Sequence, residues 1–307
     1  MTGQWLRTKV VDAKAETVAI TATYTDTINL PKTNFIGNIL VALKGVCVAT
    51  GTITVNKIEV IGNGAATLVS LSGAQIQKIM SFDYSNRQMA VSAAGVNLGD
   101  GIAAAGTETV YMPYIISFGR FIGDTLCMLP AKLFKTLQLK ITYSTAVAAW
   151  TSLALYVVVD EYVSDEDPAT KLILKKTEIE GKATGTGDTD FDLPLGNAYR
   201  RLMLYVSACT TVTTISLRAN NGAEIPYTDD WSLIQIMNLY DYEMMGTTYT
   251  TLGMNWTDNW VMIDLDRSDT LSKAIDTTNL NDLKLRVSRG ATTTTAVLVA
   301  EEIVSIG

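Results

Sequence analysis

The stretch NGAEIPYTDDWSLIQIMNLYDY, from Asn221 to Tyr242, repeats the pattern of an earlier one, NGAATLVSLSGAQIQKIMSFDY, from Asn63 to Tyr84. Shifted by 158 residues without a gap, the two stretches keep Asn-Gly-Ala, Ile-Gln and Asp-Tyr in register. Each places an Asn-Gly turn ahead of a segment that is expected to be helical. Two separated copies of one pattern predict an internal repeat.

The correspondence extends on both sides of these stretches. A Leu-Pro segment precedes each copy, an alternating strand follows it, and each half closes on a Glu-x-Val-Ser segment. The matching pairs are residues 26–31 with 189–194, 123–126 with 268–271, 136–142 with 282–288, and 161–164 with 302–305. Their order is the same in both halves while the offset falls from 163 to 141 residues, as expected of two copies with loops of different length.

Short strands rich in Thr, Val and Ile dominate the rest of the sequence. Thr136–Thr142 alternates apolar and polar residues, which is the period of a half-buried strand. The continuous apolar runs Leu155–Val159 and Val297–Val299 predict strands that are buried on both faces. The chain is therefore expected to be mostly β.

Two short helices interrupt the strands, one in each repeat. Ser72 is placed to cap a helix over Ala74–Phe82, and Asp229-Asp230 precedes a second helix over Trp231–Leu239. A third short helix is expected over Thr270–Ile275.

The predicted fold class is all-β, with two tandem eight-stranded jelly rolls and short helices in the loops. Each repeat has room for about eight strands, and an immunoglobulin-like sandwich would be shorter and would lack these helices. An acidic, Pro-containing segment separates the halves. The predicted divisions are an N-terminal arm (1–15), a first jelly roll (16–165), a linker (166–175) and a second jelly roll (176–307).

Composition narrows the range of functions. The chain has 307 residues, a net charge of −7 and no histidine. The missing histidine excludes Ser-His-Asp triads and His-ligated zinc sites and so argues against an enzyme. The acidic balance argues against specific nucleic-acid binding. Three widely spaced cysteines indicate free buried thiols rather than a disulfide framework. The N-terminal residues lack the apolar core of a signal peptide.

The doubled arrangement resembles a known family. A Leu-Pro strand, an Asn-Gly turn, a helix ending on Asp-Tyr and a closing Glu-x-Val-Ser strand, all present twice, resemble the double jelly-roll major capsid proteins of tailless icosahedral bacteriophages with an internal membrane. The resemblance is greatest to the short-chain members, such as the corticovirus coat protein and that of the flavobacterial lipid-containing phage. It covers roughly residues 16 to 307.

This resemblance implies a structural protein of the virion capsid, made in the host cytoplasm. The implied assembly is a homotrimer with six similar lobes, which builds an icosahedral shell over an inner membrane. The implied partners are other copies of the chain, minor capsid or penton proteins and the lipids beneath the shell. No cofactor is expected, although carboxylates at subunit junctions leave room for an unassigned structural divalent cation.

The N-terminal arm is the one segment with candidate site residues. Trp5, Arg7, Lys9 and Lys14 combine an indole with three cations. In the family such an arm commonly lies beneath the shell, and this combination suits a layer of lipid headgroups. An ordinary first strand with solvent-exposed charges is the alternative.

Two other functions stay open. The runner-up is a tandem β-sandwich that binds carbohydrate or a receptor as a spike component. The third is a glycosidase using Asp229 and Asp230 beside Trp231, but the first repeat has no equivalent acids, which favours helix capping.

Three further motifs have ordinary explanations. Asp264–Asp269 lacks the Gly and Glu positions of an EF-hand loop and is expected to form a turn. Asn255 begins a glycosylation sequon, to which little weight is given. Arg200-Arg201 is too small for a nucleic-acid patch and is expected on a solvated face or in an interface salt bridge.

Overall fold

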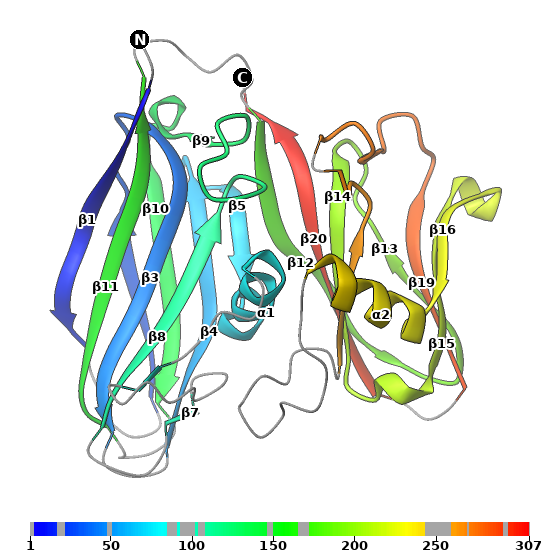
Figure 1. The fold of residues 1–307 in the computed structure, drawn as a ribbon, viewed down its shortest axis with the longest axis horizontal. Coiled ribbons are helices and arrows are strands. Elements are labelled where there is room, and N and C mark those ends of the chain that lie inside the picture. Colours follow the sequence, from blue (N-terminus) through cyan, green and yellow to red (C-terminus); the bar gives the residue numbers. More distant parts are fainter. Residues whose placement is uncertain are drawn as a thin grey trace. The chain divides into compact units, whose positions relative to one another are not determined.

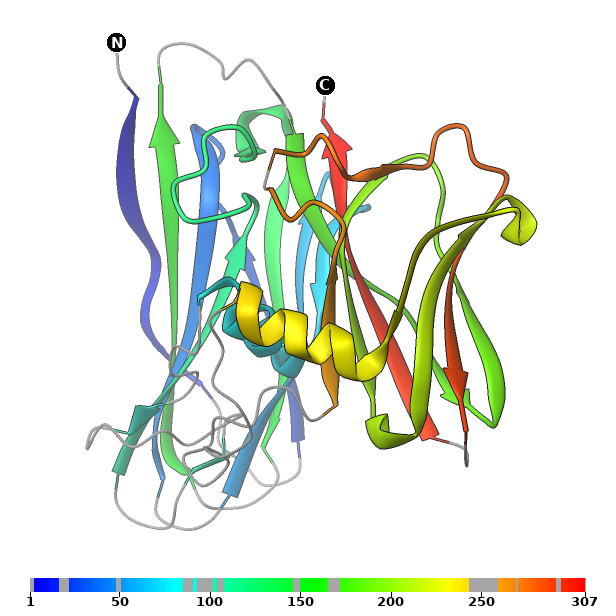
Figure 2. The ribbon, with the colours of Figure 1, turned by 45° about the vertical axis from the view of Figure 1, so that its right-hand side comes forward.

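Strands form most of the chain in the computed structural model (Figure 1). The structure describes residues 3–16, 22–47, 51–84, 91–92, 102–103, 108–145, 150–164, 172–242, 259–268, 270–290 and 294–306. The chain divides into two compact units, residues 1–174 with 305–307 and residues 175–304. In Figures 1 and 2 each unit has long strands that run side by side, with a short helix next to them.

The first unit contains eight principal strands. They are β1 (Gln4–Ala15), β2 (Ala22–Asn29), β3 (Phe35–Cys47), β4 (Gly51–Gly62), β5 (Ala66–Leu71), β8 (Glu108–Ser117), β10 (Leu137–Thr145) and β11 (Trp150–Val163). Shorter elements are β6 (Val91–Ser92), β7 (Ile102–Ala103), β9 (Leu129–Pro130) and the 3₁₀ turn η1 (Ala131–Leu133). One sheet has the order β1-β11-β3-β8, and the other has the order β5-β4-β10-β2.

The second unit repeats this arrangement. Its principal strands are β12 (Leu172–Thr184), β13 (Gly187–Asp192), β14 (Ala198–Val206), β15 (Val212–Ala219), β16 (Glu224–Asp230), β17 (Trp260–Asp264), β19 (Leu283–Arg289) and β20 (Thr294–Ser305). Shorter elements are β18 (Ile275–Asp276) and the 3₁₀ turns η2 (Cys209–Thr211) and η3 (Asn220–Gly222). The orders β12-β20-β14-β17 and β16-β15-β19-β13 match those of the first unit strand for strand.

This shared strand order is that of a jelly roll, in which two four-stranded antiparallel sheets lie face to face. Neighbours in each sheet come from distant parts of the sequence: β1 pairs with β11 and β13 pairs with β19, both antiparallel. The predicted fold class is confirmed.

Alternating strands bury one side of each sheet. In β10, Leu137, Leu139 and Ile141 are buried while the residues between them are partly exposed. In β19 the pattern from Leu283 to Arg289 alternates throughout, and its buried residues join one core with β13, β14, β15, β17 and β20. Alternation with a period of two therefore indicates both that the segment is a strand and which of its side chains face the core.

The two repeated helices occur where the sequence predicts them. Helix α1 (Gly73–Asp83) begins at a capping box, because Ser72 Oγ accepts from the Gln75 N–H at 3.2 Å and Gln75 Oε1 accepts from the Ser72 N–H at 2.8 Å. Helix α2 (Trp231–Asp241) follows the N-cap residue Asp230, whose side chain makes no capping hydrogen bond. The predicted capping bond at Asp229-Asp230 is therefore wrong.

Two other local predictions are also wrong. Residues 270–274 form turns instead of a helix, since Leu271 has a φ of 64° and its N–H donates to Asp266 Oδ2 at 2.6 Å. The run Leu155–Val159 belongs to β11 but alternates, with Tyr156 and Val158 only half-buried. Within its sheet β11 lies between β1 and β3.

The predicted N-terminal arm and the predicted linker both contribute residues to strands. Residues 4–15 of the predicted arm form β1, and 172–175 of the predicted linker begin β12. Residues 166–171 of that linker lie outside the described part of the chain.

Candidate interaction surface

Strand β1 is the edge of its sheet and carries all four candidate residues. It pairs with β11 along its length, with Trp5 opposite Tyr162 and Arg7 opposite Asp160. None of its side chains is fully buried, although it is twelve residues long. A long, exposed edge strand is a natural place for another molecule to bind.

The Trp5 indole lies next to Tyr162 and Gly37. Its ring lies 5.3 Å from that of Tyr162, centroid to centroid. It also covers Gly37, where an added Cβ would come within 2.6 Å of the indole carbons. Gly37 is the extra residue of a β-bulge in β3, because Asp160 pairs with Asn38 and Glu161 pairs with Ile36. The absence of a side chain at Gly37 therefore leaves room for the indole.

Beside Trp5 lies an ion pair at the mouth of a cavity. Arg7 Nε donates to Asp160 Oδ1 at 2.7 Å and Nη2 donates to Oδ2 at 3.1 Å. The hydrogen bonds to Asp160 raise the pKa of Arg7. The cavity measures about 380 Å³ and is lined by Trp5, Leu6, Arg7, Asn38, Ile122, Gly123 and Asp160. The cavity is therefore lined mainly by apolar side chains, together with one ion pair.

The loop after β8 supplies the other wall of this cavity and is held by an internal carboxylate. Arg120 Nε donates to Asp124 Oδ2 at 2.7 Å, and the Leu126 N–H donates to Asp124 Oδ1 at 2.9 Å. Partial burial acts to raise the pKa of Asp124, but these hydrogen bonds outweigh it and lower the pKa. In this loop the side chains of Phe121, Ile122 and Leu126 are about half exposed.

Lys9 and Lys14 do not reach this cavity. Lys9 pairs with Asp12 on its own strand at 3.2 Å. Lys14 lies 3.0 Å from Glu16 and also pairs with Asp26. Burial acts to lower the pKa of Lys14, and these two carboxylates raise it. The structure thus places Trp5 and Arg7 together at one end of β1 and Lys14 at the other.

The second unit has a bulge equivalent to the one at Gly37, but with charged residues around it. Arg200 is the extra residue of a bulge in β14, and Glu301 in β20 stands where Asp160 stands in β11. Glu301 pairs with Arg200, with Arg201 at 2.8 Å and with Lys176 at 3.4 Å. Burial alone would raise the pKa of Glu301, but these three cations hold it well below its ordinary value.

This cluster corrects the expectation for Arg200 and Arg201. Both are buried, at 2% and 3% exposure, and belong to an ion-pair network rather than to a solvated face. The signal in the sequence was a pair of charged residues inside an apolar strand, which occurs once in Ala198–Val206 and again in Thr294–Ser305. Charges in such a place are expected to be paired.

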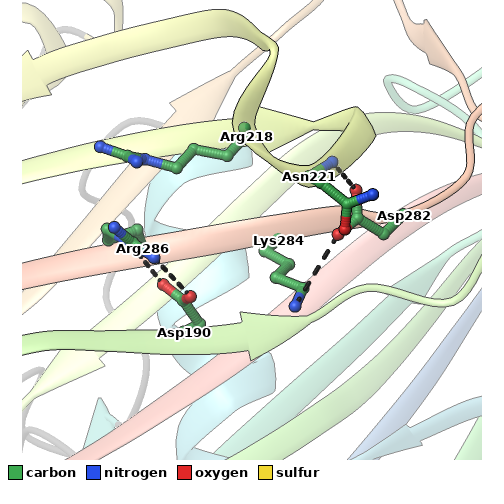
Figure 3. Close-up of a pocket in the computed structure, with 7 residues that line it drawn as sticks. Asp190, Arg218, Asn221, Asp282, Lys284 and Arg286 are labelled. Atoms are coloured by element: carbon green, nitrogen blue, oxygen red, sulfur yellow. Dashed lines mark hydrogen bonds and ion pairs between the residues drawn. The ribbon is translucent and has the colours of Figure 1, made fainter.

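A polar pocket of about 160 Å³ lies on the outer face of the second unit (Figure 3). Arg286 Nε donates to Asp190 Oδ1 at 2.6 Å, and Lys284 lies 3.8 Å from Asp282. The hydrogen bond from Arg286 lowers the pKa of Asp190. Each of these carboxylates already faces a cation, so the pocket is a surface ion-pair network.

The remaining motifs do not converge on a catalytic or metal site. Trp231 is 4% exposed and packs in the core, so its ring is not available to stack on a sugar. Asp269 and Asn255 lie outside the described residues. Within the described ranges, no group of three acidic or cysteine side chains is arranged to hold a metal. Among the same residues no helix is long and apolar enough to cross a membrane.

Two cysteines have side chains in the described part of the chain. Cys127 is buried, as predicted for the cysteines, whereas Cys209 is only half-buried. The side chain of Cys47 is outside the described set.

The whole chain superposes on solved viral coat proteins. The structure titled "Crystal Structure of the STIV MCP" matches with a TM-score of 0.75 and 17% identity, over 99% of this chain and 97% of that one. The chain has the double jelly-roll fold. Major capsid protein P2 of bacteriophage PM2 matches at 0.64 with 14% identity over 98% of both chains. The Faustovirus major capsid protein matches at 0.62 with 8% identity, over 100% of this chain and 91% of that one.

These matches rest on structure alone. No protein-family model matches the sequence, and a search of curated proteins finds no match. This chain and these two coat proteins each cover nearly the full length of the other.

Proposed function

We propose that this double jelly roll is the major capsid protein of an icosahedral virus. The observation that carries the proposal is the pair of units with one strand order, which matches a known capsid protein over nearly the full length of both chains. Its role is structural, without chemical turnover. It acts by self-association through buried area and complementary charge.

The proposed building block is a homotrimer. Three chains with two similar lobes each present six similar lobes, which tile a hexagonal lattice, and the free strand edges become covered. In this proposal the shell encloses an inner membrane, meets minor capsid or penton proteins at its vertices, and is assembled from chains made in the host cytoplasm. The resemblance to internal-membrane phages supports these finer points.

The test is the native mass of the purified chain by light scattering after size exclusion, followed by electron microscopy of assembled particles. A species three times the 33.2 kDa chain supports the proposal. Because surface charge is screened over about 8 Å at physiological salt, assembly is also expected to change with ionic strength. A chain that stays monomeric and forms no particles in any salt condition would contradict the capsid proposal and favour the alternative, a glycan-binding β-sandwich protein.

A further inference from the structure

Helix α2 exposes an apolar stripe. Leu233, Ile236 and Tyr240 are 48%, 59% and 85% exposed, and their spacing places them on one face of the helix. Ile225, on the strand that leads into the helix, is also half exposed. Contiguous apolar side chains on a surface indicate a site where another molecule binds.

The equivalent face of helix α1, in the first repeat, is buried. The 158-residue shift aligns the stripe with Gln75, Lys78 and Phe82 of α1. All three are buried, at 4%, 6% and 1% exposure. The face that is covered in α1 is thus uncovered in α2, and there it carries Leu and Ile in place of Gln and Lys.

Strand β16, which leads into α2, is a free acidic edge. It ends the sheet β13-β19-β15-β16. Its sequence EIPYTDD carries Glu224, Asp229 and Asp230 and no cation. Among the described residues, none of these three acids forms an ion pair.

Strand β1 is a free edge of opposite charge. It ends the sheet β1-β11-β3-β8, and its sequence QWLRTKVVDAKA carries three cations and a single acid. Arg7 and Lys9 are largely exposed even though each has a carboxylate neighbour. The apolar cavity beneath Trp5 and Leu6 adjoins this edge.

We propose that the β16–α2 surface of one copy docks on the β1 surface of a second copy. The acidic edge meets the basic edge, and the apolar stripe meets the apolar hollow. The two surfaces differ, so the contact is heterologous, and repeated contacts of that kind form a closed ring when the rotation between copies closes. This inference rests on the proposed function, since it names the contact that would hold the capsomer together.

The contact is made through side chains along much of its length. Pro226 lies within β16 and has no N–H to donate, so an uninterrupted backbone ladder across the junction is not available. Lipid is the other partner expected for β1. The matching acidic edge and apolar stripe on the same chain favour a protein partner.

Charge reversal tests the pairing of the two edges. One variant carries Arg7→Glu and Lys9→Glu, a second carries Glu224→Lys and Asp229→Lys, and a third carries all four substitutions. Sedimentation velocity at low salt is expected to show association weakened at least about tenfold in each of the first two, and restored to within about threefold in the third. Lys135→Glu with Lys273→Glu makes the same charge change as the first variant at exposed positions elsewhere, and is expected to associate normally.

Apolar contact is tested separately. Ile236→Asp is expected to weaken association about tenfold or more, whereas Leu195→Asp, at another exposed apolar position, is expected to have no effect. Each variant is compared with the parent by thermal unfolding. Lys9→Gln with Asp229→Asn provides a milder version of the charge test should a reversed chain fail to fold.

The outcomes separate this inference from the proposed function. Trimers or particles that persist in every variant would overturn the assigned contact and leave the capsid proposal standing. Failure of the four-substitution variant to recover would overturn the edge-to-edge pairing. A parent chain that never associates would overturn both. If the first variant loses flotation with anionic vesicles while its association stays intact, β1 faces lipid instead.

Discussion

Gly37 and Arg200 occupy equivalent β-bulges in the two jelly rolls, but the two residues make different contacts there. Gly37 leaves room for the Trp5 indole above β3, whereas Arg200 extends a guanidinium that pairs with Glu301. The carboxylate on the last strand is retained in both units, as Asp160 and as Glu301. One backbone irregularity therefore supports an exposed pair in one unit and a buried cluster in the other.

Removing the carboxylate charge should have very different costs at these two positions. Glu301→Gln leaves Arg200, Arg201 and Lys176 buried without their counter-ion, and is expected to lower the free energy of unfolding by about 3–5 kcal/mol. Asp160→Asn removes the partner of Arg7, whose side chain is 72% exposed, and is expected to cost less than about 1 kcal/mol. Urea denaturation of both variants measures this difference, and equal losses would contradict the assignment of Glu301 to a buried network.

The glycine at the first bulge is expected to control Trp5. In Gly37→Ala the new methyl group would lie within 2.6 Å of the indole, so the ring must swing outward. Because the ring is exposed and can move, the free energy of unfolding is expected to fall by only about 1 kcal/mol. Acrylamide is expected to quench Trp5 fluorescence more strongly, where the Trp5 signal is the difference between each chain and the same chain carrying Trp5→Phe. Gly185→Ala is the control, because nothing lies within 4 Å of its Cβ position. Unchanged quenching would show that the indole does not rest on Gly37.

The two helix N-termini give a second matched pair. Ser72→Ala removes the hydrogen bond that the hydroxyl accepts from the Gln75 N–H, while the bond from the backbone N–H of residue 72 to Gln75 Oε1 can persist. The substitution is expected to lower stability by about 1 kcal/mol. Asp230→Ala, at the same position of α2, removes no capping hydrogen bond and is expected to change stability by less than about 0.5 kcal/mol. Thermal unfolding compares the two, and a larger effect at Asp230 would mean that its side chain caps the helix.

Asp124 should contribute to loss of stability in acid. Because its folded-state pKa is lowered, its stabilising effect is fully present above the ordinary carboxyl pKa of about 4 and is lost as pH falls through the folded value. Asp124→Asn is therefore expected to cost about 1–3 kcal/mol near neutral pH, with the gap to the parent closing as the pH is lowered below about 4. Urea midpoints across this range test it, and a gap that does not depend on pH would contradict it.

The sequence predicts the repeat, the strands and two helices because these depend on local patterns. Alternation in Leu137–Thr142 and in Leu283–Ser288 fixes which side chains face the core, and Ser72 marks the start of α1. The third helix fails because Asp266 stabilises a left-handed Leu271, a contact between side chain and backbone that periodicity does not register.

The candidate surface was only partly predictable for a related reason. Trp5 and Arg7 stand out by residue type, but their partners Tyr162 and Asp160 are more than 150 residues away and meet them only through strand pairing. The different burial of α1 and α2 is likewise invisible in the sequence, since the two helices align without a gap. Such features depend on how the sheets come together, not on any single segment.

Pro226 bears on how the edge of β16 avoids β-aggregation in the proposed assembly. A free edge strand with a complete set of N–H groups can add strands from any unfolded or misfolded neighbour and so begin a fibre. An imino acid in the middle of β16 interrupts that template, while the acids around it still recognise a cationic surface. Growth by folded subunits is then favoured over indiscriminate β-aggregation, and Pro226→Val is the change that would remove this protection.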